Sequence, residues 1–235
     1  LHLPSTLTQI GEMAFYNTTI KNFYKDENNQ TFSTIDGILY KDKIILYAFP
    51  ASKEMQDFVL PDQIRTIYDD AFNHSQVSKI TINQGAIEIG DRAFFASALK
   101  DIYIPASINK IGETAFAECN DLINITVNNQ NEHFQDIAGD ALLSANSKEM
   151  LAYCLGLSST SYTIPTGVEK IHSAVFFSSL YLEEIVLPSS ITDIGGHALS
   201  APFLSAVVFN SYLPPQIEHN SISGSSLIIY VPNQR

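Results

Sequence analysis

The stretch LKDIYIPASINKIGETAF, residues 99–116, contains the two phrases that decide the fold of this chain. The first phrase, L-x-x-I-x-I-P, spaces its apolar residues as in a short strand whose last two apolar side chains share one face. Pro105 ends that strand, because proline cannot donate to a hydrogen-bond ladder. The second phrase, I-G-x-x-A-F, starts six residues after Pro105 and predicts a short helical or 3₁₀ turn that inserts Phe116 into the interior.

The second phrase recurs along the whole chain. Its copies begin at Ile10, Ile67, Ile89, Ile111, Ile171 and Ile194, the last two being looser. Neighbouring copies are 22, 22 and 23 residues apart, and two longer steps span 57 and 60 residues. A proline stands six residues before five of these isoleucines, at Pro4, Pro61, Pro105, Pro165 and Pro188. One such unit is too short to bury its own apolar side chains, so we expect the copies to stack into a solenoid with a parallel sheet.

The two longer steps each contain an insert. Each insert is interpreted as a pair of strands around a polar turn, at 41–43 in the first and 145–148 in the second. The related inserts divide the chain into two tandem supermodules, about 1–98 and 99–203, followed by a terminal repeat at 204–235. Because repeats grow as one body, we expect a single domain.

The charge balance limits the kinds of partner. The chain has 13 Lys and Arg against 25 Asp and Glu, a formal net charge of −12. Proteins that bind nucleic acid neutralise phosphates with Lys and Arg, so this surface disfavours nucleic acid, and anionic membranes for the same reason. No apolar run of about eighteen residues occurs, so no membrane insertion is expected within this sequence. The chain opens in the middle of a repeat, and we therefore expect a longer natural protein whose export signal lies outside this sequence.

Together, the I-G-x-x-A-F and L-x-x-I-x-[IL]-P phrases resemble the BspA-like leucine-rich repeats, and the resemblance covers essentially the whole chain. It implies an α/β solenoid, rich in β-structure: a right-handed superhelix with a parallel β-sheet on the concave face, short helical or 3₁₀ turns and two hairpin-type inserts. Residues 1–235 would form one leucine-rich-repeat domain. The pattern departs at Tyr68 and His172, which replace glycine, and at Leu199, which replaces phenylalanine.

The resemblance implies a cell-surface or secreted location and a role in adhesion. The expected partner is a protein on a host or neighbouring cell, or in the extracellular matrix. A carbohydrate-binding or glycoconjugate-binding module of the same architecture is the alternative, as is the non-catalytic part of a larger secreted enzyme. These functions are analogies, because one fold hosts many functions.

A partner of a solenoid is expected on the strand positions that do not enter the core, which would form one continuous exposed face. The candidate binding residues are Thr81, Tyr103, Thr126, Val186, Val208, Lys79, Asp101 and Glu184. Tyr103 is the natural anchor, since tyrosine combines a large contact area with a hydrogen-bonding tip. The alternative is that these are ordinary side chains that are solvated or packed against a neighbouring repeat.

No catalytic motif is found, and we expect no enzyme activity and no cofactor. The six histidines fall on different repeats without the spacing of metal ligands, so no metal site is expected. Weak calcium binding by acidic loops and use of the glycosylation sequons stay open. Cys119 is interpreted as a buried small hydrophobe, and its pairing with Cys154 cannot be judged from the sequence.

Overall fold

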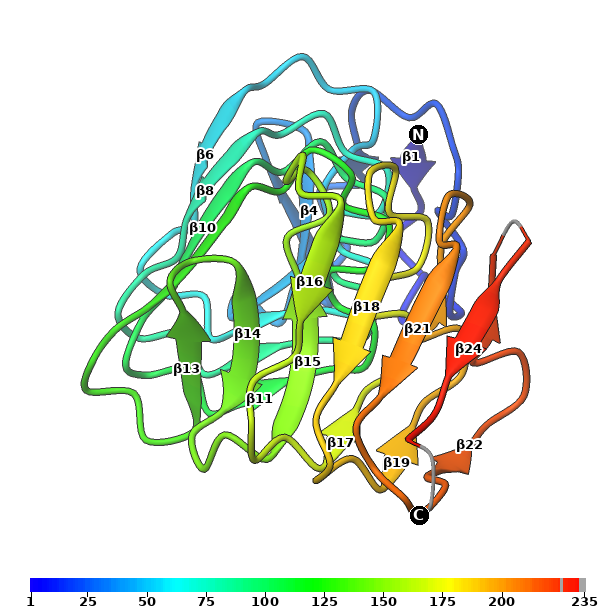
Figure 1. Ribbon diagram of the computed structural model, residues 1–235. Helices are drawn as coiled ribbons and strands as arrows, with labels where there is room; N and C mark the ends of the chain where they lie inside the picture. Colours follow the sequence, from blue (N-terminus) through cyan, green and yellow to red (C-terminus); the bar gives the residue numbers. More distant parts are fainter. Residues whose placement is uncertain (225, 233–235) are drawn as a thin grey trace.

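Residues 1–224 and 226–232, which the computed structural model describes, wind into a β-solenoid of about 10 turns (Figure 1). The stacking of the copies is therefore confirmed. All 24 elements of the described residues are β-strands, and none of these residues lies in a helix. The expected α/β class is accordingly wrong for the described chain, which is all-β.

Two four-stranded parallel ladders carry the strands of the L-x-x-I-x-I phrase. The first contains, in order, β6 (Asp57–Val59), β8 (Lys79–Thr81), β10 (Asp101–Ile104) and β12 (Asn124–Val127). The second contains β16 (Ser161–Thr163), β18 (Glu184–Leu187), β21 (Ala206–Phe209) and β24 (Ile228–Tyr230). In Figure 1 the second ladder lies across the front, while β6, β8 and β10 lie on the far side of the insert that separates the ladders.

Two six-stranded sheets join the inserts to the strands that end in the repeated isoleucine. The first runs through β3 (Phe32–Ile35), β4 (Ile38–Lys41), β5 (Ile45–Ala48), β7 (Thr66–Ile67), β9 (Glu88–Ile89) and β11 (Lys110–Ile111). The second runs through β13 (Phe134–Ile137), β14 (Ala141–Ser144), β15 (Glu149–Tyr153), β17 (Lys170–Ile171), β19 (Asp193–Ile194) and β22 (Gln216–Ile217). Two small pairs complete the fold: β1 (His2–Leu3) with β2 (Tyr24–Lys25), and β20 (Leu199–Ser200) with β23 (Ile222–Ser223).

The inserts are larger than the predicted strand pairs. Each contains three antiparallel strands, and the third strand of each, β5 or β15, pairs in parallel with the next coil. The predicted polar turns connect the second and third strands: 145–148 lies between them, and 41–43 begins at the last residue of β4. An insert therefore takes the place of one coil of the solenoid. Its third strand pairs in register with a strand of the next coil, β7 or β17.

The segments around the Ala-Phe pairs are successive turns rather than the predicted helical or 3₁₀ turns. In one coil, Asp70 and His74 have positive φ values of 57° and 56°, which a right-handed helix excludes. The N–H of Ala71 donates to the carbonyl of Tyr68 in its own coil, whereas the N–H of Phe72 donates to Ala93 in the next coil, at 2.7 Å. Because alternate N–H groups bond to the neighbouring coil, this flank extends the stacking instead of forming a helix.

The interior is filled by rings stacked from coil to coil. Phe49, Phe72, Phe94 and Phe116 form one stack of nearly parallel rings. The distances between successive ring centroids are 5.1, 5.2 and 5.4 Å. All four phenylalanines are buried. The stack confirms the prediction that the Ala-Phe phrase inserts its ring into the core.

The repeated glycine after the isoleucine allows neighbouring coils to approach closely. A Cβ atom at Gly112 would lie 2.4 Å from the backbone nitrogen of Asp91 in the preceding coil. Tyr68 and His172 occupy the same position in the two coils that follow an insert, where the preceding element is β5 or β15. The departures from glycine therefore coincide with the two places where an insert strand replaces the preceding coil.

Candidate binding faces

The outward residues of the two long ladders form two surfaces, because successive side chains of a strand point to opposite sides. In β10 the burial alternates, so that Ile102 and Ile104 enter the core while Asp101 and Tyr103 are exposed. The N-terminal face is defined by the outward residues Asp57, Val59, Lys79, Thr81, Asp101, Tyr103, Asn124 and Thr126. The C-terminal face is defined by Ser161, Thr163, Glu184, Val186, Ala206, Val208, Ile228 and Tyr230.

The eight candidate residues fall on both faces. The structure places Lys79, Thr81, Asp101, Tyr103 and Thr126 on the N-terminal face and Glu184, Val186 and Val208 on the C-terminal face. The register pairs Tyr103 with Thr126, Lys79 with Asp101, and Val186 with Val208. Each face therefore brings its own candidates together, in rows that cross the strands.

The prediction of one continuous face is wrong, because the second insert separates the two. β12 is the last strand of its ladder. Beyond it, the N–H of Ile125 donates to the carbonyl of Gly139 at 2.8 Å, and the N–H of Val127 donates to Asp136 Oδ2 at 2.9 Å. Both acceptors belong to the hairpin that β13 and β14 form. This hairpin, instead of a further parallel strand, therefore lies along the free edge of β12.

The N-terminal face centres on Tyr103, a residue that is 40% exposed. Its hydroxyl accepts a hydrogen bond of 2.6 Å from the Asn128 side-chain amide. The hydroxyl of Tyr103 can still donate its own hydrogen to a partner. The hydrogen bond from Asn128 holds the hydroxyl group in place. Asn128 was missed by sequence reasoning, although its position directly after β12 was a usable signal.

The charges of the N-terminal face compensate one another. Lys79 lies between Asp57 and Asp101 in the register of the three strands, and Lys100 precedes β10. The outward residues of this face therefore include two acids and one base, and Lys100 adjoins them as a second base. Its surface is polar and close to neutral.

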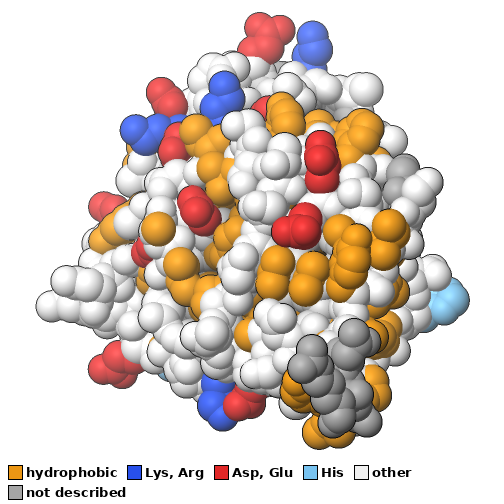
Figure 2. Space-filling model, viewed as in Figure 1, with side chains coloured by type: hydrophobic (Ala, Val, Ile, Leu, Met, Phe, Trp, Pro, Cys, Tyr) orange, Lys and Arg blue, Asp and Glu red, His pale blue; other side chains and the backbone are white. Residues whose placement is uncertain are grey.

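The C-terminal face is more apolar. Val186, Val208 and Tyr230 form one row across β18, β21 and β24, and Tyr230 is 51% exposed. Ile228 is exposed in the neighbouring row, next to Ala206. Figure 2, viewed onto this ladder, shows hydrophobic side chains gathered over it with separate acidic groups among them, whereas basic side chains lie at the periphery of the view.

Sequence reasoning also missed two exposed rings beside the C-terminal face. Tyr181 and Phe203 each stand three residues before a strand of the ladder, β18 and β21, and both are exposed. They are equivalent residues of adjacent coils, 22 positions apart. An aromatic residue at the same phase of two successive repeats was the available signal.

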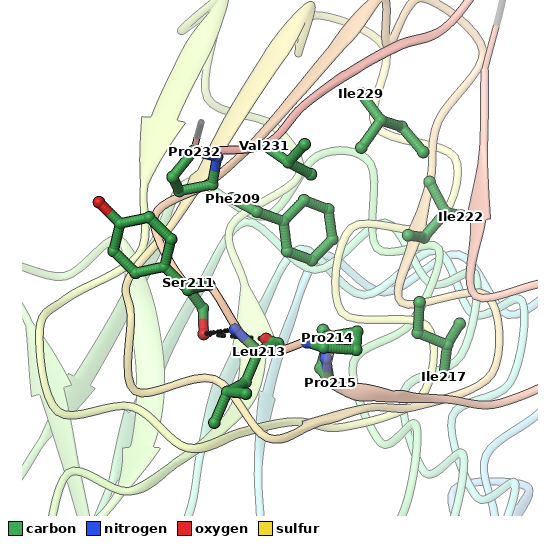
Figure 3. Close-up of a pocket in the computed structure, with 11 residues that line it drawn as sticks. Phe209, Ser211, Leu213, Pro214, Pro215, Ile217, Ile222, Ile229, Val231 and Pro232 are labelled. Atoms are coloured by element: carbon green, nitrogen blue, oxygen red, sulfur yellow. Dashed lines mark hydrogen bonds between the residues drawn. The ribbon is translucent and has the colours of Figure 1, made fainter. Parts of the chain in front are cut away.

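A hollow lies at the C-terminal end of the solenoid. Its volume is about 460 Å³, and its wall includes Phe209, Ile217, Ile222, Ile229 and Val231. Figure 3 shows these side chains around a shared space. Of the described residues that line it, only Tyr212 has a titratable side chain.

The two cysteines are interior groups. Both are buried and free, and the Cys119 thiol donates to the carbonyl of Phe94 at 2.9 Å. Burial raises the pKa of Cys119 and of Cys154 to about 12. The interpretation of Cys119 as a buried small hydrophobe is confirmed, and the two residues do not pair with each other.

Two further properties concern metals and membranes. Among the described residues, no group of three or more His, Cys, Asp or Glu is arranged to hold a metal ion. Within the same residues, no helix is long and apolar enough to cross a membrane.

Stacked coils of about 22 residues with parallel strands and a recurring Ile-Gly and Ala-Phe phrase define the class of leucine-rich-repeat solenoids. The chain belongs to the family of the BspA type leucine rich repeat region, which matches residues 1–36, 42–149 and 145–230 in six copies. The resemblance deduced from the phrases is thereby confirmed.

Solved structures of bacterial proteins share this fold. A leucine rich cell surface protein from Faecalibacterium prausnitzii is 25% identical, with a TM-score of 0.64 over 88% of this chain and 59% of that protein. The pneumococcal vaccine antigen PcpA is 19% identical, with a TM-score of 0.61 over 99% of this chain and 74% of that one. A leucine-rich repeat protein from Eubacterium ventriosum is 17% identical, with a TM-score of 0.60 over 99% and 72%. The last two support the fold alone, and no curated protein matches the chain significantly.

Proposed function

We propose that this chain is a binding region of a bacterial cell-surface protein and holds a polypeptide partner against its outward strand faces. The surface location is supported by membership of the BspA type family and by the similar cell surface protein of F. prausnitzii. The chain spans only 59% of the length of that protein. What a longer protein containing this chain would bind is therefore also proposed.

The observation that carries the proposal is the aligned row of Val186, Val208 and Tyr230 on the C-terminal ladder, together with the exposed ring of Tyr103 on the polar N-terminal face. Solvated strand positions are ordinarily polar, and exposed apolar rows on a rigid scaffold mark interaction sites. Tyr103 lies on one face and Tyr230 on the other, and tyrosine is enriched among residues that dominate binding energy. The partner is a protein of a host cell, a neighbouring cell or the extracellular matrix.

Substitution of Tyr103 tests the proposal. The chain would be immobilised and presented with purified matrix and cell-surface proteins, and the dissociation constant of each protein that binds would be measured. For a partner held on the N-terminal face, Tyr103→Ala should raise the dissociation constant at least ~10-fold, as loss of a central anchor does. The melting temperature should stay almost unchanged, since the ring is exposed.

Tyr24→Ala is the matched control, because Tyr24 is an exposed tyrosine on β2, a strand that belongs to neither ladder. It should leave binding at the wild-type level. A partner whose affinity is insensitive to Tyr103→Ala and also to Tyr230→Ala would show that the strand faces are not the binding surface.

A further inference from the structure

Two carboxylates of the C-terminal face have no compensating charge in the described chain. Glu184 begins β18 in the outward row, and Glu183 precedes it and is exposed. The sequence from 171 to 234 contains no lysine or arginine. The four ion pairs found among the described residues all lie elsewhere and involve neither glutamate.

These carboxylates border an apolar surface. The row of Val186, Val208 and Tyr230 lies two residues along the strands from the row of Glu184, a separation of about 6.6 Å at the usual strand rise. Apolar contact and negative charge therefore occur side by side in parallel rows. A surface of this kind fits a partner that presents an apolar stripe flanked by positive charge.

The N-terminal face gives no such preference. Its acids Asp57 and Asp101 flank Lys79, so a charged partner would meet both signs at once. Among the residues that the structure describes, the absence of basic side chains is thus a local property of the C-terminal face and not a consequence of the net charge alone.

We propose that the C-terminal face binds a cationic amphipathic segment of a polypeptide. Its apolar side chains pack on the row of Val186, Val208 and Tyr230, and its Lys or Arg side chains pair with Glu183 and Glu184. This inference rests on the proposed function and names the chemistry of the partner.

An α-helix laid across the strands matches the spacing of the rows. The strands are about 4.8 Å apart, and successive turns of a helix are about 5.4 Å apart, so apolar residues one turn apart can follow Val186, Val208 and Tyr230. A neighbouring basic stripe of the same helix then falls over the row of Glu184. Rings at Tyr181 and Phe203 extend the apolar contact at the start of the strands.

A lipid surface is the less suitable occupant. Binding to anionic membranes depends on Lys and Arg near the surface, and this face presents carboxylates instead. Vesicles of phosphatidylcholine and phosphatidylglycerol therefore serve as a further arm of the test.

The test measures binding of three synthetic amphipathic peptides of equal length to the full chain by titration calorimetry. The first has a leucine stripe and lysines, the second has the same stripe with glutamates, and the third has lysines with serines in place of leucines. Only the leucine–lysine peptide should bind. The double variant Glu183→Gln/Glu184→Gln should raise its dissociation constant at least ~10-fold, because charge pairs that a partner covers are stronger than exposed ones.

Asp57→Asn/Asp101→Asn is the matched control, since it removes the same net charge from the N-terminal face. It should change the dissociation constant less than ~2-fold, apart from the small effect of net charge. Val208→Thr keeps the branched shape of the side chain and should weaken binding several-fold by adding a hydroxyl to the apolar row. Melting temperatures of all variants show whether the solenoid stays folded.

Four results would overturn the inference: no binding of the leucine–lysine peptide, equal binding of the leucine–glutamate peptide, equal loss in both double variants, or stronger binding to vesicles than to peptide. The proposed function fails separately. If the peptide does not bind but a protein partner is lost on Tyr103→Ala, the function stands and the cationic partner is rejected.

Discussion

The two strand faces are built by the same repeat and yet differ in character. On the N-terminal face, Asp57, Lys79 and Asp101 alternate in sign, and Tyr103 is held by Asn128. On the C-terminal face the equivalent rows are largely apolar and carry only negative charge. The inward positions must stay apolar for the coils to stack, whereas the outward positions are free to vary. The difference therefore teaches that binding specificity in this solenoid lies in the outward residues of each ladder.

The interiors behind the two faces also differ. Behind the N-terminal face, four phenylalanines stack without interruption from Phe49 to Phe116. Behind the C-terminal face, Tyr153 packs on Phe176 at 5.0 Å, and the next coil has Leu199 at the equivalent position. The buried residues form separate clusters on the two sides of the second insert. The N-terminal half should accordingly depend more strongly on its ring stack.

Phe94→Ala is expected to have the largest effect. Phe94 is fully buried between Phe72 and Phe116, so its loss should reduce the free energy of unfolding by ~3–5 kcal/mol. Phe15→Ala should cost less, because Phe15 belongs to the first coil and is only partly buried. Urea denaturation followed by circular dichroism measures both. Equal losses, or an unchanged midpoint for Phe94→Ala, would contradict the stacked core.

Exchange of Ser179 and Cys119 should have an intermediate effect. Both residues stand eight positions after the repeated isoleucine, one in each half. Ser179 is fully buried, and its hydroxyl has no hydrogen-bond partner among the described residues, whereas the thiol of Cys119 bonds to the carbonyl of Phe94. Ser179→Cys should therefore stabilise the protein by ~1 kcal/mol, and Cys119→Ser should destabilise it by a similar amount.

Ser179→Ala separates the cost of burying the Ser179 hydroxyl from the gain that a thiol brings at this position. It removes the buried hydroxyl without adding volume, so it should also be stabilising if desolvation of the hydroxyl is the cost. A loss of stability in both Ser179 variants, measured by the same denaturation, would mean that the hydroxyl is satisfied in solution.

The phase of the repeat was sufficient to predict the stacked strands and the buried rings, because proline, isoleucine and phenylalanine recur at fixed spacing. It was insufficient for the turn flank. Asp70 and His74 adopt left-handed conformations without being glycine, and the hydrogen bonds that hold them reach the next coil. The residue pattern of a single repeat does not show which hydrogen bonds form between neighbouring coils.

The site was predicted only in part for a related reason. Alternation within a strand identified the outward residues, including Tyr103 and Val208. The interruption of the face was not predictable, since it depends on the hairpin near Gly139 reaching the edge of β12. The sequence shows the added length of an insert but not where its turn docks.

Asp69→Asn is expected to have the smallest effect, and it tests the turn flank of the N-terminal half. Asp69 Oδ1 accepts from the backbone N–H of Asp91 at 2.8 Å, and Asp91 Oδ1 accepts from Glu113 in turn. Burial raises the pKa of Asp69, the hydrogen bond from Asp91 opposes that rise, and the nearby charge of Asp91 adds to it. An asparagine keeps the oxygen acceptor and removes the charge.

The sign of the pH dependence follows from the raised pKa. A carboxyl whose pKa is higher in the folded protein contributes stability that is present below the unfolded value, near 4, and is lost as the pH rises through the folded value. Asp69→Asn should therefore raise the melting temperature at pH 7 by about 2 °C and give no gain at about pH 3. Asp62→Asn, an exposed aspartate on the same half, should change neither value. If Asp69→Asn lowers the melting temperature at pH 7, the charge itself stabilises the contact between these coils.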